Sequence, residues 1–294
     1  MDLGPVGIWT FCLDGQPSAR AREIAAELES LGYGSLWIPE VMGRDPFVAA
    51  SGLLAGTERL VVGTGIASVW ARDALAMKSA WYTVEEAHPD RFILGLGVSH
   101  QPFVDGMRAA TYEKPLSKMR AYLDAMDMAP FAASPPTTTP KRVLAALGPK
   151  MLALAGEKTD GAHPYNGTPE HTAAAREIMG PGKLLAVEQK VVCVEDAAAA
   201  REIARGMLRV YTPLPNYANN WKRLGFTDDD LADGGNDRFV DTVVAWGSED
   251  TIKRRVQAHL DAGADHVCIQ VLTAEGFAAR PIDEWRRLAP ALTS

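Results

Sequence analysis

The chain has 294 residues, of which 47% are hydrophobic and 23% are charged. This composition is ordinary for a globular protein and excludes a disordered, collagen-like or coiled-coil chain. Thirty Lys and Arg residues against 37 Asp and Glu residues give a net charge of −7. A negative chain has no general attraction for nucleic acids or anionic membranes, so we expect neither as a partner.

The cysteines and the start of the chain favour a cytoplasmic protein. Cys12, Cys193 and Cys268 are odd in number and far apart, so they predict neither a disulfide framework nor a structural zinc site. The first residues lack the basic and apolar regions of a signal peptide. The uncharged run 60–71 has 12 residues, whereas a membrane-spanning helix needs about 20.

Short runs typical of buried strands alternate along the chain with longer segments of helical periodicity. In chain order, the eight predicted strands span residues 6–10, 35–39, 60–66, 92–98, 143–146, 162–164, 184–194 and 266–272. Helices are predicted between them, and the last strand is followed by a helix. This α/β pattern predicts a single (β/α)8 TIM-barrel domain over residues 1–294, in preference to a doubly wound sheet.

Two segments exceed what a minimal barrel needs. They span residues about 102–140 and 212–248, and both are rich in turn-forming residues. Long segments of this kind often cover a binding site, so we assign both to the rim at the carboxyl ends of the strands. For residues 134–140, a mobile surface loop is an open alternative.

Catalytic residues of a barrel lie just after its strands, and two such positions carry acid–base side chains. Glu40 follows the second predicted strand and could carry a proton if burial raises its pKa toward neutrality. An ion pair with Arg44 is the alternative. His100 follows the fourth strand, where an imidazole suits acid–base chemistry or a hydrogen bond to a cofactor. Trp70, just past the third strand, is the tryptophan we expect in the pocket.

The segment 166–170 has the sequence of a turn that enters a helix. Thr168 can cap that helix and Pro169 can open it, which leaves exposed backbone amides able to hold a phosphate. An ordinary capped helix is the alternative. The glycine pairs in residues 63–65 and 95–97 indicate close backbone approach, either to neighbouring side chains or to a flat ligand. Their spacing is not that of a dinucleotide-binding fingerprint.

Several catalytic classes lack their motifs. The sequence contains no GxSxG, HExxH or GxxxxGK[ST] motif and no cluster of His and carboxylate residues at metal-ligand spacing. We therefore expect no metal site. A barrel enzyme without an evident nucleophile or metal most plausibly takes its chemistry from an organic cofactor.

Four segments carry a resemblance to a known family: LGYGSLWIPE (31–40), TERLVVGTGI (57–66), HPDRFILGLGV (88–98) and AGADHVCIQV (262–271). They resemble the bacterial luciferase-like monooxygenase superfamily, and more closely its branch that uses the deazaflavin coenzyme F420. The resemblance covers nearly the whole chain in the right order. Flavin-dependent and deazaflavin-dependent members share these segments, so they specify the superfamily better than the cofactor.

The resemblance implies a barrel with the cofactor across its carboxyl mouth. A non-prolyl cis peptide, here between Gly65 and Ile66, would back the cofactor ring. The implied ring contacts are Val98, Ser99 and His100, and the implied phosphate-binding turn is Tyr165, Asn166, Gly167 and Thr168. The resemblance also makes a homodimer an expectation.

The chain departs from the sugar-phosphate dehydrogenases of this group. These carry Asp-His after the second strand and Glu after the fourth, whereas this chain has Pro39-Glu40 and Ser99-His100. A different substrate and proton path follow. The hypothesis is that Glu40 and His100 flank the reacting carbon and one of them carries the proton.

The expected function is therefore an F420-dependent oxidoreductase that passes a hydride between the deazaflavin and a small organic substrate. One alternative is a two-component monooxygenase that uses flavin mononucleotide (FMN) supplied by a separate flavin reductase. Another is a catalytically silent barrel that only binds a flavin, which bulky side chains around Ile66 and Trp70 would favour.

Overall fold

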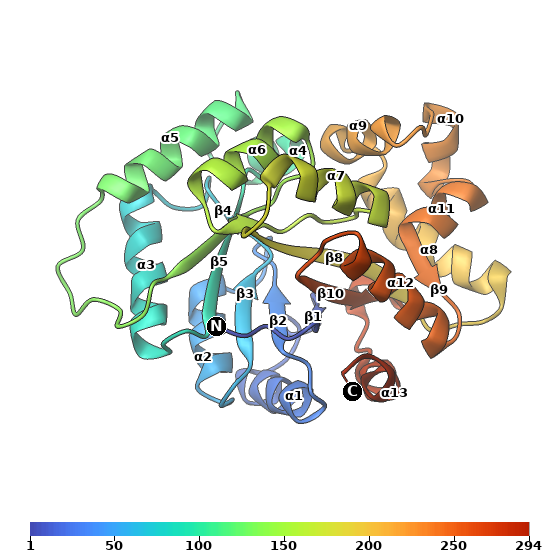
Figure 1. The fold of residues 1–294 in the computed structure, drawn as a ribbon, viewed down its shortest axis with the longest axis horizontal. Helices are drawn as coiled ribbons and strands as arrows, with labels where there is room; N and C mark the ends of the chain where they lie inside the picture. Colours follow the sequence, from blue (N-terminus) through green and yellow to red (C-terminus); the bar gives the residue numbers. More distant parts are fainter. Residues whose placement is uncertain (294) are drawn as a thin grey trace.

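The computed structural model describes residues 1–293 and contains a closed barrel of eight parallel strands (Figure 1). The barrel strands are β1 (Val6–Trp9), β2 (Ser35–Ile38), β3 (Val61–Thr64), β5 (Phe92–Gly97), β6 (Lys141–Leu144), β7 (Gly161–Ala162), β8 (Leu184–Val192) and β10 (His266–Val271). They pair in that order, and β10 closes the ring by pairing with both β8 and β1. Each strand overlaps one of the eight predicted from the sequence, and the TIM-barrel prediction is confirmed.

Two short strands lie outside the predicted set. β4 (Ala67–Ser68) pairs with β5, and β9 (Val244–Trp246) pairs with β8. Between β3 and β4 the peptide from Gly65 to Ile66 is cis, as the resemblance implies. The chain thus leaves the barrel wall after β3 and rejoins it beside the carboxyl half of β5, where Ala67 is opposite Leu96.

In the described residues, seven helices connect the barrel strands, an eighth follows the last strand, and together they cover the outside of the barrel. They are α1 (Ser18–Ser30), α2 (Pro46–Leu54), α3 (Ala74–Ala87), α5 (Pro115–Met128), α6 (Pro149–Lys158), α7 (Pro169–Met179), α12 (Glu249–Asp261) and α13 (Ile282–Leu292). Several begin with Pro, whose missing N–H is not needed in a first turn. Asp45, Asp73 and Ser248 accept hydrogen bonds from backbone N–H groups at the starts of α2, α3 and α12.

The segment 102–140, which exceeds a minimal barrel, contains two helices that lie in different parts of the fold. α4 (Gln101–Met107) lies just after β5, whereas α5 packs between α3 and α6 in the outer layer. The following residues return to the amino end of β6, where Thr138 donates a hydrogen bond to Glu85 at 2.5 Å. Residues 134–140 therefore lie beside the amino ends of the strands, away from the mouth.

The predicted excursion 212–248 is largely helical. It contains α9 (Pro215–Arg223), α10 (Asp228–Leu231), a 3-10 turn (Ala232–Gly234) and α11 (Asp237–Val243). These elements and α8 (Ala197–Tyr211) share an apolar core of their own beside β8 and β9. Figure 1 shows this group beside one flank of the barrel, with α9 at the same end as α4.

The barrel interior is unusually polar along β8 and β10. Glu188, Lys190 and Gln270 are buried there with side chains toward the interior, next to an aromatic cluster that includes Trp9 and Trp37. Within residues 1–293, no helix is long and apolar enough to cross a bilayer.

Candidate functional site

The segments expected to contact a cofactor meet at the carboxyl ends of the strands. Ile66 packs on Gly97, because a Cβ built on that glycine would lie 2.4 Å from Ile66 Cδ1. The His100 ring lies 5.3 Å from the Tyr217 ring, which is 6.1 Å from the Tyr165 ring. The fold thus brings together the residues after β3, β5 and β7.

The glycines of residues 63–65 and 95–97 are close to side chains. A Cβ on Gly63 would lie 2.5 Å from the Trp37 ring, and one on Gly65 would lie 2.4 Å from Trp9 Nε1. The sequence allowed two explanations for these glycines, close approach to side chains or to a flat ligand, and the structure shows the approach to side chains.

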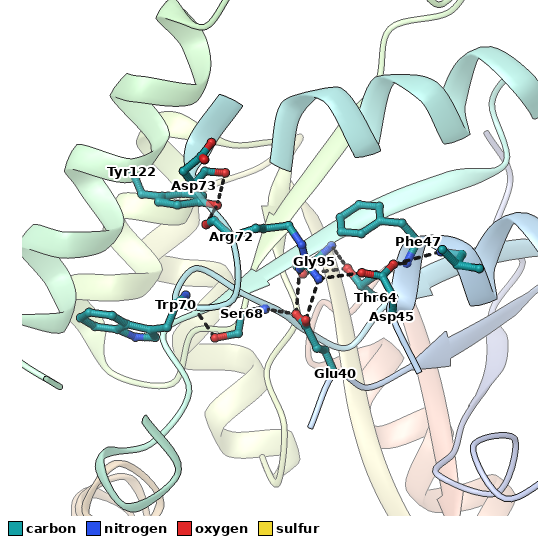
Figure 2. A network of polar contacts seen from close by, with 11 residues as sticks. Glu40, Asp45, Phe47, Thr64, Ser68, Trp70, Arg72, Asp73, Gly95 and Tyr122 are labelled. Atoms are coloured by element: carbon teal, nitrogen blue, oxygen red, sulfur yellow. Dashed lines mark hydrogen bonds and ion pairs between the residues drawn. The ribbon is translucent and has the colours of Figure 1, made fainter. Parts of the chain in front are cut away.

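Glu40 is bound by Arg72 rather than Arg44 (Figure 2). The two guanidinium nitrogens of Arg72 donate to the two carboxylate oxygens at 3.0 and 2.7 Å, and the Ser68 N–H donates at 2.7 Å. The two side chains are 9% and 15% exposed. Arg72 also binds Asp45, the cap of α2, at 3.0 Å.

Glu40 contacts the segment after β3 through its backbone as well. Its N–H donates to the carbonyl of Ile66 at 3.3 Å, while its side chain holds the N–H of Ser68. Tyr122 of α5 holds the same segment further along the chain, at Arg72, since its hydroxyl donates to the carbonyl of Arg72 at 2.8 Å (Figure 2). Glu40 therefore holds the segment that the resemblance places against the cofactor ring.

His100 stands at the start of α4 and connects it to α9. Its Nδ1 lies 3.0 Å from Asn216 Oδ1, so Nδ1 carries the hydrogen that this amide oxygen accepts. Nε2 is then an acceptor, and it has no hydrogen-bond partner within residues 1–293. Burial lowers the pKa of His100 below 6.5, which favours the neutral imidazole near pH 7.

The turn after β7 carries an unpaired amide. Asn166 has φ of 61° and is 2% exposed, and neither its Oδ1 nor its Nδ2 has a hydrogen-bond partner among the described residues. Its backbone is held on both sides, because its N–H donates to Glu188 Oε2 at 2.9 Å and its carbonyl accepts from Trp221 Nε1 at 3.2 Å. Buried polar side chains are normally paired, so an unpaired one points to a ligand.

The surroundings of Asn166 suit an anion. Thr168 caps α7 by accepting from the N–H of His171, as predicted. His171 Nε2 donates to the carbonyl of Leu147 at 2.9 Å, so its buried Nδ1, which borders Gly167, is an acceptor and contributes no hydrogen to an anion. Arg223 reaches the start of α6, with guanidinium nitrogens 3.7 and 3.9 Å from the Cβ position of Gly148. Two helix starts and a cation thus adjoin the turn.

Trp70 lies beside the expected ring contacts. Its Nε1 donates to the carbonyl of Val98 at 2.8 Å, and its ring is 6.0 Å from that of Tyr112. The Lys118 ammonium lies 4.9 Å from the Trp70 ring. These contacts join the loops after β4 and β5.

Sequence reasoning missed two buried groups near the site. The first is the pair Glu188 and Lys190, which belongs to a polar run of three residues, Glu188 to Lys190, inside an otherwise apolar strand, and this run was a readable signal. The second is His163, stacked on Trp37 at 4.2 Å with its Nε2 unpaired in the described part of the chain. It follows the very short β7, so its inward direction was not readable.

Comparison with known proteins establishes the family. The model of the luciferase-like monooxygenases matches residues 6–266. The chain therefore belongs to the luciferase-like monooxygenase family. Members of this family are enzymes, in agreement with the resemblance found in the sequence.

One relative and two solved structures carry further information. A Mycobacterium tuberculosis protein whose assigned name is coenzyme F420-dependent oxidoreductase is 25% identical, over 94% of this chain and 96% of its own. An F420-dependent secondary alcohol dehydrogenase, solved with an F420–acetone adduct, has a TM-score of 0.76 at 14% identity and covers 99% of both chains. The FMN-bound oxygenating component of a Pseudomonas putida 3,6-diketocamphane monooxygenase has a TM-score of 0.72 at 15% identity over 98% of both chains. These two structures establish the fold, and they hold different cofactors in it.

Proposed function

We propose that this protein binds coenzyme F420 at the carboxyl mouth of its barrel and oxidises or reduces a small organic molecule with it. The observation that carries the proposal is the buried, unpaired amide of Asn166, in the turn where the resemblance implies a phosphate site. The relative of M. tuberculosis, matched over nearly its full length, supports F420 as the cofactor.

The residues present fit a phosphate-bearing deazaflavin. Asn166, the start of α7 and Arg223 would hold the phosphate, since they offer an amide, backbone N–H groups and a cation. The ring would lie between Ile66 and the residues 98–100. When bound, F420 supplies a hydride-accepting or hydride-donating carbon, C5 of its deazaflavin ring.

His100 is proposed to carry the proton. Its Nδ1 is engaged by Asn216, so only Nε2 can receive a proton from a substrate hydroxyl. The neutral form that burial favours is the form needed to accept this proton. The arrangement therefore suits oxidation of an alcohol at neutral pH, and a protonated His100 would serve the reverse reaction.

Glu40 is proposed to position the ring contact. The sequence hypothesis makes Glu40 a second proton carrier, and this prediction remains open. Its carboxylate already accepts three hydrogen bonds, two from Arg72 and one from Ser68. Both carboxylate oxygens are therefore engaged within the protein, which supports the positioning role.

FMN is the second candidate cofactor, favoured by the FMN-bound structural neighbour. The phosphate site would serve FMN equally well, and the reaction would then be an oxygenation that needs a separate flavin reductase. Titration of the purified protein with F420 and with FMN, followed by cofactor and tryptophan fluorescence, tests the choice. Saturable F420 binding at least tenfold tighter than FMN binding supports the proposal, whereas the reverse preference replaces it.

The expected homodimer stays a proposal alongside the cofactor. Gel filtration with light scattering, in the presence and absence of F420, gives the molar mass in solution. A mass of twice 31.7 kDa supports the dimer, and a monomeric mass refutes it.

A further inference from the structure

The barrel interior holds an ion pair that the proposed reaction does not use. Glu188 and Lys190 are two residues apart on β8, so both side chains point inward. Both are fully buried, with Lys190 Nζ 3.1 Å from Glu188 Oε1. Proteins in which apolar residues replace such a pair are often as stable as the original or more stable, so stability alone does not explain why the pair is present.

The contacts of the pair converge on the turn after β7. Lys190 Nζ lies 3.6 Å from the centre of the Tyr165 ring and 3.1 Å from Gln270 Oε1. The Tyr165 hydroxyl donates to that same Gln270 oxygen at 2.7 Å. The second oxygen of Glu188, Oε2, accepts the N–H of Asn166 at 2.9 Å. The pair thus contacts two consecutive residues of the turn, Tyr165 and Asn166, from the barrel interior.

These contacts fix the backbone of the residue that carries the unpaired amide. Asn166 adopts left-handed backbone geometry, with φ of 61°, which Asn adopts more readily than most other non-glycine residues. Glu188 holds the N–H and Trp221 holds the carbonyl. With both backbone groups fixed, the Cα–Cβ bond of Asn166 has one direction, and neither polar atom of its side chain is bonded to residues 1–293.

We propose that Glu188 is a positioning residue for the cofactor phosphate. It accepts the Asn166 N–H and thereby fixes the backbone of the turn that is proposed to hold the phosphate, while Lys190 neutralises the carboxylate that would otherwise repel this anion. This inference rests on the proposed function, because it assumes a phosphate-bearing cofactor in the turn. It assigns to β8 a role that neither family membership nor the ring contacts supply.

The test compares two double variants that differ in a single acceptor. Glu188→Leu with Lys190→Met removes both charges and the acceptor for Asn166, and it replaces the pair with apolar side chains of similar size. Glu188→Gln with Lys190→Met removes the same charges but keeps an amide oxygen for the Asn166 N–H. The ligands are the ribityl deazaflavin with and without its 5′-phosphate, which isolate the phosphate from the ring and from the glutamyl tail of F420.

The readout is the ratio of dissociation constants for the two ligands, measured by fluorescence titration. We expect the Leu/Met variant to lose at least tenfold of the preference for the phosphorylated ligand while its affinity for the unphosphorylated one stays within twofold. The Gln/Met variant should keep most of that preference. A merely structural pair would change the two affinities together.

Each remaining outcome gives a definite answer. An unchanged preference in the Leu/Met variant overturns the role of Glu188 and leaves the proposed function standing. A wild-type protein that binds neither F420 nor FMN overturns the proposed function, and this inference with it. If the Leu/Met variant does not fold, Met at both positions removes the same acceptor with a more adaptable side chain.

Discussion

Arg72 binds both carboxylate oxygens of Glu40 across 32 residues of sequence, at 3.0 and 2.7 Å. The pair lies beside the segment that connects β3 to β4, and it is joined to that segment through the N–H of Ser68. A bidentate pair of this kind fixes geometry as well as charge. The relationship gives Glu40 a role that does not require it to move a proton.

Loss of Arg72 is expected to destabilise the protein. In Arg72→Met the carboxylate of Glu40, 9% exposed, loses its counter-charge, and breaking a buried pair in this way costs about 3 kcal/mol. Urea unfolding gives the free energy of unfolding. The matched control is Arg120→Met, whose partner Glu157 is 53% exposed, so that its loss should cost less than about 1 kcal/mol. Equal losses in the two variants would contradict a structural role for the pair of Arg72 and Glu40.

The pH profile of turnover separates His100 from Glu40. In the proposed reaction the neutral imidazole of His100 accepts the proton during oxidation, and burial lowers the pKa of His100 below 6.5. We expect kcat/KM for alcohol oxidation to be constant above this pKa and to fall as the pH drops through it. His100→Gln should remove this acidic limb and lower kcat by about 10²-fold or more.

Glu40→Gln provides the comparison for that profile. The new amide oxygen still accepts the N–H of Ser68, but the side chain no longer forms an ion pair with Arg72, so cofactor binding should weaken. Because His100 is unchanged, the variant should keep the acidic limb of the profile. If the limb disappears in Glu40→Gln and persists in His100→Gln, the two proposed roles are exchanged.

Three buried histidines predict the pH dependence of stability. Burial lowers the pKa of His163 to about 4, of His259 to about 3 and of His266 to about 4, from an ordinary 6.5. Below pH 6.5 the unfolded chain binds protons that the folded chain does not, so their stabilisation is complete above pH 6.5 and is lost as the pH falls toward 4. Each contributes a slope of about 1.4 kcal/mol per pH unit in this window.

His259→Gln tests this slope. Its imidazole pairs with Thr172 and Gln189 in the folded chain, and glutamine can pair with both without titrating. The free energy of unfolding, measured in urea between pH 7 and pH 5, should depend less steeply on pH in the variant. A slope equal to that of the wild type would show that His259 is already protonated in the folded protein.

Gly97→Ala tests the packing behind the expected cofactor ring. The new Cβ would lie 2.4 Å from Ile66 Cδ1, so Ile66 must shift, at a cost of about 1 to 3 kcal/mol. Both the melting temperature and the affinity for F420 should fall. Gly106→Ala in α4 is the matched control, because no atom lies within 4 Å of its new Cβ; a loss of F420 affinity in the control alone would place the ring elsewhere.

The sequence predicts the barrel well because each buried strand is a short apolar run between turn residues. The turn at residues 165–168 is also predictable, since Thr168 and Pro169 are local signals for a helix start. Glu40 and Arg72 are different. Their contact depends on the chain leaving the wall after β3 and returning as β4, which local sequence does not encode.

Two further features show the same limit. Residues 134–140 have the composition of a rim loop. However, they follow α5 and directly precede β6, so they lie at the amino end of that strand. The position of Glu188 and Lys190 on β8 is visible in the sequence, whereas their partners Asn166 and Gln270 come from other loops and strands. Local patterns therefore locate elements, and closure of the barrel decides which side chains meet.

The measurement that tests the central claim most directly is the titration of the wild-type protein with F420 and, separately, with FMN. We expect saturable binding of F420, at least tenfold tighter than that of FMN, with quenching of the tryptophans around the mouth. Tighter binding of FMN, or saturable binding of neither cofactor, would contradict this expectation.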